Sequence, residues 1–316
     1  MTFAVVFPGQ GSQSVGMLAE LAAEYDCVQD TFSEASEIFG LDLWDLSQNG
    51  TTEALADTRM TQPLMFVSGV AVWRVLQQSD LPKPVVVAGH SLGEFAAMVA
   101  SGSLAFTDGV QLVKVRAELM ASAVPAGEGG MAALIGMDDD DVVKLCQSVT
   151  GERVSEAVNF NAPGQVAISG HRDALDKTVT LAREQGCRKA IMLAVSVPNH
   201  SSLMRAAGAE LAATMDTISW NSADIPLVQN ATAEVAANQE KALETLKAHV
   251  YSPVYWTRTI QNLRDVHGVS AIIEAGPGKV LTGLSKRIDR TLPTFPVDSA
   301  DTLAKALESL TEVAAD

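Results

Sequence analysis

Cysteines, basic residues and long hydrophobic runs are all scarce in this sequence. The three cysteines, Cys27, Cys146 and Cys187, are odd in number and far apart, so they predict neither a disulfide framework nor a CxxC zinc site. No apolar stretch is long enough for a membrane-spanning helix, and the first residues lack the basic start and apolar run of a signal peptide. We therefore expect a cytoplasmic protein without a membrane segment.

The shortage of basic residues makes the chain strongly acidic. Its 22 Lys and Arg against 38 Asp and Glu give a formal net charge of −16. Such a balance opposes binding to nucleic acid, and it means that an acidic partner must dock on a local basic patch. Apolar residues make up 47% of the 316 positions, which is enough for a buried core in one large domain, with or without a smaller insert.

Short apolar strands alternate with helical patterns over much of the chain. This alternation predicts an α/β fold with a mostly parallel sheet. The expected strands are 3–7, 85–89 and 271–274, and the expected helices are 18–39, 61–79, 92–101 and 107–123.

A different order of elements follows the Pro- and Gly-rich segment 125–130, which resembles a linker. The expected strands there are 131–136, 154–160, 164–169 and 189–194, with helices at 138–148 and 171–186. The resulting order, β-α-β-β-α-β, is the ferredoxin-like pattern. We predict a ferredoxin-like subdomain, 127–194, inserted into a larger catalytic domain made of 1–126 and 195–316.

The segment Gly89-His90-Ser91-Leu92-Gly93 matches the G-x-S-x-G pattern of a nucleophile elbow. It directly follows a predicted buried strand and precedes a predicted helix, which is the context that the elbow requires. The glycines permit a sharp turn that exposes the Ser91 hydroxyl, and the N–H groups of the following helix can stabilise a developing negative charge. The pattern therefore predicts acyl transfer through Ser91.

A serine nucleophile needs a base, and the sequence offers five histidines. Of these, His200 follows the loop 195–199 and precedes a helix, where catalytic groups commonly lie. His171 suits a helix cap in the insert, and His267 lies in a polar loop. Two glycine-rich segments do not fit nucleotide motifs: 9–14 lacks the third glycine of G-x-G-x-x-G, and 274–280 lacks the Ser or Thr of a P-loop.

Together these segments resemble the malonyl-CoA:acyl carrier protein transacylase family. Five motifs occur in family order and cover nearly the whole chain: Phe7-Pro8-Gly9-Gln10-Gly11-Ser12-Gln13, Gly89-His90-Ser91-Leu92-Gly93-Glu94, Asn159-Phe160-Asn161-Ala162-Pro163-Gly164-Gln165, Ser196-Val197-Pro198-Asn199-His200 and Glu274-Ala275-Gly276-Pro277-Gly278-Lys279-Val280-Leu281. The resemblance implies an α/β-hydrolase-like core that carries a ferredoxin-like insert.

The resemblance also implies a role for individual residues. Ser91 would be the nucleophile and His200 the general base, while Gln10 and the backbone N–H of Leu92 would form the oxyanion hole. Arg116 would bind the malonyl carboxylate. Without the resemblance, an exposed helix arginine paired with a carboxylate would be the ordinary interpretation of Arg116.

Two positions depart from the family pattern. The family holds its histidine through a main-chain carbonyl, and the matching residue here is His249, where members commonly have glutamine. A carbonyl can accept the ring N–H whatever the side chain, so we expect this role to survive. Asn199 stands where many relatives carry serine.

By resemblance, the enzyme would move a malonyl group from malonyl-CoA to the phosphopantetheine thiol of holo acyl carrier protein, in fatty acid biosynthesis. No metal or organic cofactor is implied, and neither is a nucleic-acid or membrane partner. Acyl carrier proteins are acidic, so docking needs basic side chains. The candidates are Arg188, Lys189, Lys279, Lys286, Arg287 and Arg290.

Two other classes of protein share part of this pattern. A serine hydrolase, such as a thioesterase or an esterase, would use the same elbow and base but pass the acyl group to water. A catalytically inactive module would only bind the carrier protein. The presence of both Ser91 and His200 argues against the inactive module, whereas the choice between water and thiol cannot be read from residue types.

Overall fold

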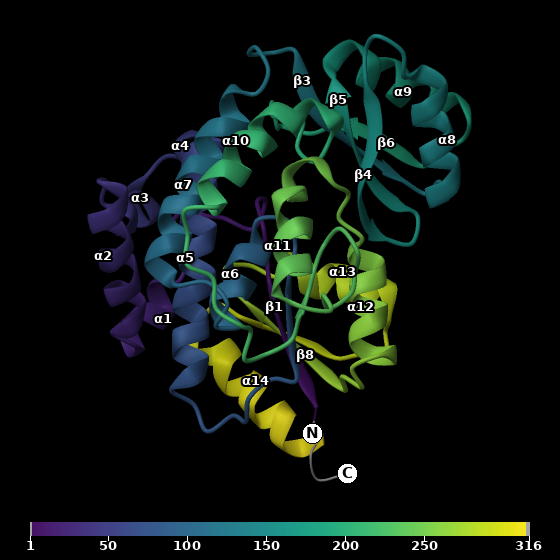
Figure 1. Cartoon of the computed structure of the whole chain (residues 1–316). Coiled ribbons are helices and arrows are strands. Elements are labelled where there is room, and N and C mark those ends of the chain that lie inside the picture. Colours follow the sequence, from purple (N-terminus) through teal and green to yellow (C-terminus); the bar gives the residue numbers. More distant parts are fainter. Residues whose placement is uncertain (1, 314–316) are drawn as a thin grey trace.

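The computed structural model describes residues 2–313, which form an α/β protein with two separate sheets (Figure 1). The larger sheet is parallel throughout, in the order β7-β2-β1-β8-β9. Its strands are β1 (Phe3–Phe7), β2 (Val86–Gly89), β7 (Leu227–Val228), β8 (Ala271–Ala275) and β9 (Thr294–Val297). The expected strands near β1, β2 and β8 are confirmed, whereas β7 and β9 were not predicted.

Helices surround this sheet. They are α1 (Ala19–Glu24), α2 (Cys27–Phe39), α3 (Leu43–Asn49), α4 (Thr52–Ala56), α5 (Thr58–Gln77), α6 (Gly93–Ala100), α7 (Phe106–Ser122), α10 (Arg205–Met215), α11 (Gln239–Lys247), α12 (Trp256–Asp265), α13 (Val280–Ile288) and α14 (Ala300–Val313), with short 3-10 turns at Ser202–Met204 and His249–Tyr251. The single helix expected over 18–39 is two helices, because Tyr25 takes up an extended backbone between them.

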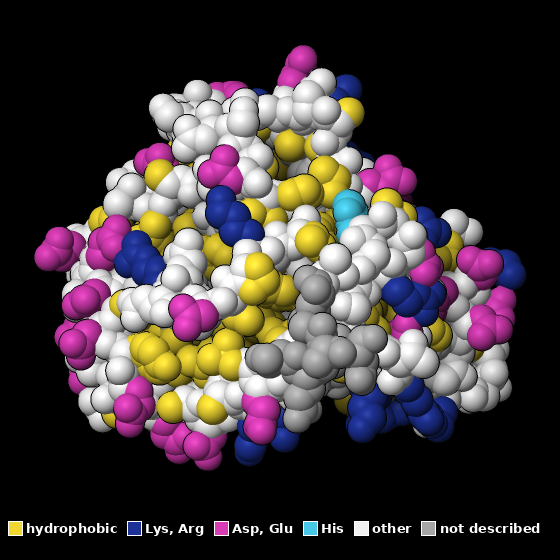
Figure 2. Space-filling view, turned by 90° about the horizontal axis from the view of Figure 1, so that it is seen from below, with side chains coloured by type: hydrophobic (Ala, Val, Ile, Leu, Met, Phe, Trp, Pro, Cys, Tyr) yellow, Lys and Arg dark blue, Asp and Glu magenta, His cyan; other side chains and the backbone are white. Residues whose placement is uncertain are grey.

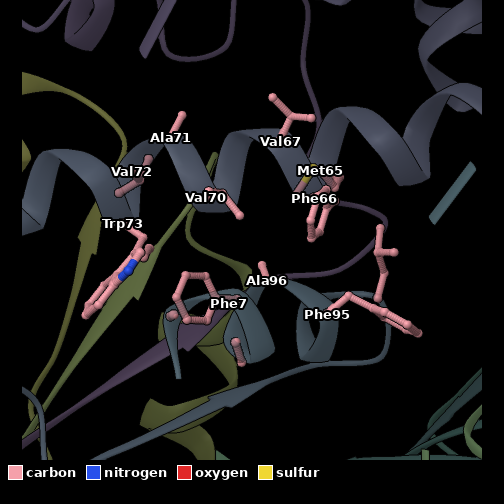
Figure 3. Packing of buried hydrophobic residues seen from close by; sticks show 14 of the residues in the cluster. Phe7, Met65, Phe66, Val67, Val70, Ala71, Val72, Trp73, Phe95 and Ala96 are labelled. Carbon is pink, nitrogen blue, oxygen red and sulfur yellow. The ribbon is translucent and has the colours of Figure 1, made fainter. Parts of the chain in front are cut away.

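The core lies between α5, α6 and the strands of the parallel sheet. Residues 61–73 of α5 are all buried, and Figure 3 shows Phe7 of β1 beside Ala96 of α6 and below Val70 of α5. Gly69 leaves room for this contact, since a Cβ there would lie 3.2 Å from the Ala96 side chain. Close packing of α6 on β1 and α5 fixes the position at which α6 begins, directly after the elbow.

The second sheet is antiparallel, in the order β4-β5-β3-β6, and is the teal unit of Figure 1. Its elements are β3 (Gly129–Ile135), α8 (Asp139–Val149), β4 (Ser155–Ala162), β5 (Gln165–His171), α9 (Arg172–Glu184) and β6 (Lys189–Met192). The predicted order of elements is confirmed. The expected linker 125–130 is shorter than predicted, because its last two residues pair with β5 as part of β3.

Three neighbouring parallel strands end at the same edge of the larger sheet. β1 leads into Pro8-Gly9-Gln10, β2 into His90 and Ser91, and β8 into a glycine turn before α13. The carboxyl edge of a parallel sheet is where ligand sites commonly form. Among residues 2–313, no helix is both long and apolar enough to cross a membrane.

Candidate active site

The turn between β2 and α6 has the geometry of a nucleophile elbow. Ser91 has a φ of 50°, in the left-handed region, which for a residue other than glycine is a strained conformation costing about 1–3 kcal/mol. Both glycines of the motif are required by close backbone contacts. A Cβ on Gly89 would overlap the carbonyl of Gly93, and a Cβ on Gly93 would overlap the carbonyl of Phe7.

The side chain of Ser91 meets that of His200 across the carboxyl edge of the sheet. Ser91 Oγ lies 2.7 Å from His200 Nε2, so the hydroxyl is placed to donate to this nitrogen. His200 is only 2% exposed and also has a left-handed backbone, with a φ of 65°. Residues 109 positions apart in the sequence are therefore brought into hydrogen-bond contact.

Two main-chain carbonyls hold the other ring nitrogen of His200. Its Nδ1 lies 3.1 Å from the carbonyl oxygen of His249 and 3.0 Å from that of Ser252. Since both oxygens can only accept, Nδ1 must carry the proton, and Nε2 is left free to accept from Ser91. The second carbonyl, from Ser252, was not predicted from the sequence.

The surroundings of His200 favour its neutral form. Burial is the main cause, and the positive charge of Arg116 adds to it; together they lower the pKa of His200 from 6.5 to about 3. The His249 carbonyl acts in the opposite direction. His200 is therefore an unprotonated base at neutral pH, ready to accept a proton from Ser91.

Arg116 is fully enclosed rather than exposed. It lies on α7 with 1% exposure, and its Nη1 donates to Gln62 Oε1 of α5. Its Nε and Nη2 atoms have no hydrogen-bond partner among the described residues, and its guanidinium lies 5.4 Å from the ring centroid of Phe95. Burial lowers the pKa of Arg116 to about 9, opposed by Glu94, so the side chain is a cation with two unused donors.

The loop after β1 and the start of α6 offer two free backbone donors. Within residues 2–313, neither the N–H of Gln10 nor that of Leu92 donates a hydrogen bond. The side chain of Gln10 is already engaged, because its Nε2 donates to Thr58 Oγ1 at 3.0 Å. The N–H of Ser91 is also engaged, because it donates to Asn230 Oδ1 at 2.7 Å.

A cavity of about 220 Å³ lies between the two sheets and includes both Ser91 and His200 in its lining. Its other walls come from Gln10 on the parallel-sheet side and from Asn159 and Asn161 on the antiparallel sheet. Arg116 does not line this cavity; it lies behind the site, near Phe95. The described residues contain no group of three or more His, Cys, Asp or Glu placed to hold a metal ion.

Several residues near the site were not predicted from the sequence. Asn230, which directly follows Gln229 after β7, bonds the carbonyl of Gly89 and the N–H of Ser91, and Glu94 bonds Asn230 in turn. Glu94 belonged to a recognised motif, which was a signal for its importance but not for its contacts. Asn230 had no such signal, because β7 is too short to form a pattern.

The rings of His90 and His171 bond to groups other than Ser91 and His200. His90 Nε2 is 2.7 Å from Asn161 Oδ1 of the antiparallel sheet, so it connects the two units. His171 occupies the N-cap position of α9, but its ring does not cap the helix; its Nδ1 accepts the N–H of Val154 at 2.8 Å instead.

The predicted basic residues of the carrier-docking patch lie on both units. Lys286 and Arg287 are exposed on α13, and Arg287 donates to Gln165 Oε1 of β5. Gln165 pairs with Ile135 in the sheet, and Ile135 pairs with Lys189 on its other side. Two strand spacings, roughly 10 Å, therefore separate the backbone of Lys189 from that of Gln165.

Comparison with known proteins places these features in one family. The model of the acyl transferase domain family matches residues 4–306. The malonyl CoA-acyl carrier protein transacylase of Escherichia coli K12 is 44% identical over 306 residues, covering 97% of this chain and 99% of the relative. The Bacillus subtilis protein of the same name is 40% identical, covering 98% and 97%.

Solved structures agree with this similarity. The malonyl-CoA:acyl carrier protein transacylase of Xanthomonas oryzae pv. oryzae superposes with a TM-score of 0.95 at 46% identity, covering 98% of this chain and 99% of that chain. A malonyl-transacylase in complex with its type II PKS acyl-carrier protein also has a TM-score of 0.95, at 41% identity, covering 98% and 100%.

Proposed function

The chain belongs to the malonyl CoA-acyl carrier protein transacylases of the acyl transferase family, and we propose that its reaction proceeds through a malonyl-Ser91 intermediate. It is an acyltransferase that moves the malonyl group of malonyl-CoA to the phosphopantetheine thiol of acyl carrier protein, in fatty acid biosynthesis. The observation that carries this function is the 2.7 Å contact between Ser91 Oγ and His200 Nε2, beside a cavity.

In the first half of the reaction, the Ser91 hydroxyl attacks the thioester carbonyl while its proton moves to His200 Nε2. The carbonyls of His249 and Ser252 keep the Nδ1 proton in place, so the ring accepts at Nε2 only. As the intermediate collapses, the C–S bond breaks and His200 returns the proton to the departing CoA thiolate.

The oxyanion of each tetrahedral intermediate needs preorganised donors. We assign this role to the backbone N–H groups of Gln10 and Leu92, because both lack another acceptor and both adjoin the cavity or the nucleophile. The Ser91 N–H does not qualify, since Asn230 occupies it. Losing one oxyanion donor typically costs about 3 kcal/mol in the barrier.

The second half reverses the first with a different thiol. The phosphopantetheine thiol of the carrier attacks the malonyl-serine ester, His200 accepts its proton, and the proton then passes to Ser91 Oγ as the ester C–O bond breaks. One site serves both thiols, so ping-pong kinetics follow. Arg116 would bind the free carboxylate of the malonyl group through Nε and Nη2.

We interpret the larger unit, 1–126 with 195–316, as an α/β-hydrolase-like catalytic domain, and 127–194 as a ferredoxin-like subdomain. The parallel sheet with a serine elbow after a strand supports the first interpretation. In the second unit, the β-α-β-β-α-β order and the sheet order β4-β5-β3-β6 support the other.

The carrier protein would dock on the basic residues at the edge shared by α13 and the antiparallel sheet. Lys189, Lys286 and Arg287 support this choice, because the sheet register and the Arg287–Gln165 bond bring them to one edge. On the face shown in Figure 2, Lys and Arg side chains gather in small groups among Asp and Glu side chains. Charge reversal at Lys286 and Arg287 should raise the KM for the carrier without changing malonyl loading; unchanged transfer would place the patch elsewhere.

Labelled malonyl-CoA and holo acyl carrier protein provide the direct test of the function. The expected result is label on the carrier, dependent on Ser91, with a malonyl mass increase on Ser91 when the carrier is omitted. Free malonate with an unlabelled carrier would indicate a hydrolase. A protein that acquires no label would be a binding module, and either result would contradict the proposed transfer.

A further inference from the structure

One asparagine spans the nucleophile elbow. The Ser91 N–H donates to Asn230 Oδ1 at 2.7 Å, and Asn230 Nδ2 donates to the carbonyl of Gly89 at 2.6 Å. The amide therefore binds the residue before the turn and the nucleophile itself, from one side. Asn230 is 2% exposed, so water offers no substitute for either bond.

A buried carboxylate fixes this asparagine. Glu94 Oε2 accepts the backbone N–H of Asn230 at 3.0 Å and also accepts from Asn230 Nδ2. Glu94 lies in the first turn of α6 with 1% exposure. Both donors meet the same oxygen, which orients the amide with Nδ2 toward Gly89 and Oδ1 toward Ser91.

The same carboxylate adjoins the residue that orients the base. Glu94 Oε2 lies 3.5 Å from His249 Nε2, and the carbonyl of His249 accepts from His200 Nδ1. Glu94 thus contacts Asn230, which binds the nucleophile, and His249, whose carbonyl orients the base. Such an arrangement can couple the placement of Ser91 to that of His200.

We propose that Asn230 and Glu94 form a positioning clamp, which holds Ser91 in its left-handed conformation and so aligns its hydroxyl with His200. This role rests on the proposed function, because it concerns the same nucleophile. The clamp also engages the N–H of Ser91, which leaves the N–H of Leu92 as the free donor on that side. Neither residue touches the acyl group in this proposal.

Changing Asn230 to Asp tests the orientation of the amide with little change in shape. The substitution keeps the oxygen that accepts from the Ser91 N–H. It replaces Nδ2, which donates to Gly89 and Glu94, by a second carboxylate oxygen that cannot donate. We expect kcat at pH 8 to fall about 10²-fold, as a misplaced nucleophile would give. The KM for malonyl-CoA should change little, since the cavity and Arg116 are untouched.

The pH profile separates this role from a loss of packing. At lower pH the two adjacent carboxyl groups can share a proton, which restores a donor, so the Asn230→Asp variant should recover activity from pH 8 to pH 6. The charged or titratable groups near this pair are His249, Arg116, His200 and His90. Burial lowers the pKa of each of the three histidines, so none of them should produce a rise in this range.

Four further variants, one of them a control, complete the test. Glu94→Gln keeps an oxygen for both Asn230 donors and should remain within about threefold of the parent chain, whereas Glu94→Ala should lose about 10²-fold. Combining Glu94→Gln with Asn230→Asp places an amide donor beside the new carboxylate, so this double variant should recover at least about tenfold and lose the pH dependence. Asn238→Asp, at an exposed helix cap, is the matched control.

Two readouts make the outcomes distinct. Malonyl transfer to carrier reports the complete reaction, and the rate at which a fluorophosphonate labels Ser91, followed by mass spectrometry, reports the nucleophile alone. A parent chain that labels normally but transfers no malonyl group would overturn the proposed function while still testing the clamp. The clamp would be overturned if the fluorophosphonate labelled Asn230→Asp at the parent rate. It would also be overturned if neither lower pH nor the added Glu94→Gln change restored the activity that Asn230→Asp loses.

Discussion

Replacing Arg116 by alanine should change which acyl group the enzyme transfers. The guanidinium is buried with two unused donors, Nε and Nη2, and a carboxylate can accept from both. Hydrogen bonds to charged groups contribute about 1.5–3 kcal/mol each, so the pair is worth about 3–6 kcal/mol. The expected loss in kcat/KM for malonyl-CoA is therefore about 10²- to 10⁴-fold.

Acetyl-CoA provides the comparison, because an acetyl group has no carboxylate to lose. Its kcat/KM should fall less than tenfold, so the ratio of malonyl to acetyl transfer should drop by about 10²-fold or more. Arg116→Lys should lie between the parent chain and Arg116→Ala, since it keeps the charge but loses the planar fork. Arg74→Ala, which removes a pair with Glu34, is the control for loss of an arginine.

The assay measures initial rates of carrier acylation with each thioester, and mass spectrometry of the Ser91 acyl-enzyme checks the first half-reaction. An equal loss for malonyl and acetyl groups would refute the reasoning. It would mean that Arg116 supports the site as a whole, through Gln62 and Glu94, rather than binding the substrate carboxylate.

Four other outcomes follow from the same geometry. Because burial keeps His200 neutral, with its pKa lowered to about 3, kcat/KM should show no acid limb near pH 6.5, the ordinary histidine value. The unfolded chain protonates this histidine first, so its contribution to the free energy of unfolding should fall as pH drops from 6.5 toward 3, as denaturant titrations would show. Gly93→Ala should destabilise the fold by about 3 kcal/mol in urea titrations, since its Cβ would meet the Phe7 carbonyl. His249→Gln should keep transfer within about threefold in the same assay, because it retains the main-chain carbonyl that accepts from His200; a tenfold loss would show that the edge-to-face contact between the His249 and His200 rings matters.

The strands that sequence patterns predicted share a simple property. β1, β2 and β8 are runs buried on both faces and apolar except for Glu274 of β8, which leaves little alternative to a central parallel strand. β7 has only two residues, and β9 contains Pro296 at the edge of the sheet, so neither gives a periodic signal. Such strands exist because a neighbouring strand offers hydrogen bonds, and the local sequence carries no record of that neighbour.

The residues of the site also divide into those with a local sequence signal and those without one. The turn at Ser91 is a local feature, because Gly89 closes on the backbone of Gly93 only four residues further along the chain. The contacts of Asn230 with Ser91 join residues 139 positions apart, and no pattern within a single segment predicts them. Burial of Arg116 was equally hidden, since a helix repeats its pattern whether an arginine faces solvent or α5.

Among the described residues, no carboxylate bonds the ring of His200, and this fits the charge of the substrate. Neutral carbonyls of His249 and Ser252 hold His200, whereas a carboxylate in that place would stabilise the imidazolium but also compete with a malonyl carboxylate for Arg116. Glu94, the acidic side chain that contacts His249, has its pKa raised to about 7 by burial, so it is only partly ionised at neutral pH. A site that receives an anionic acyl group thus has Arg116 as the permanent charge among the described residues around Ser91.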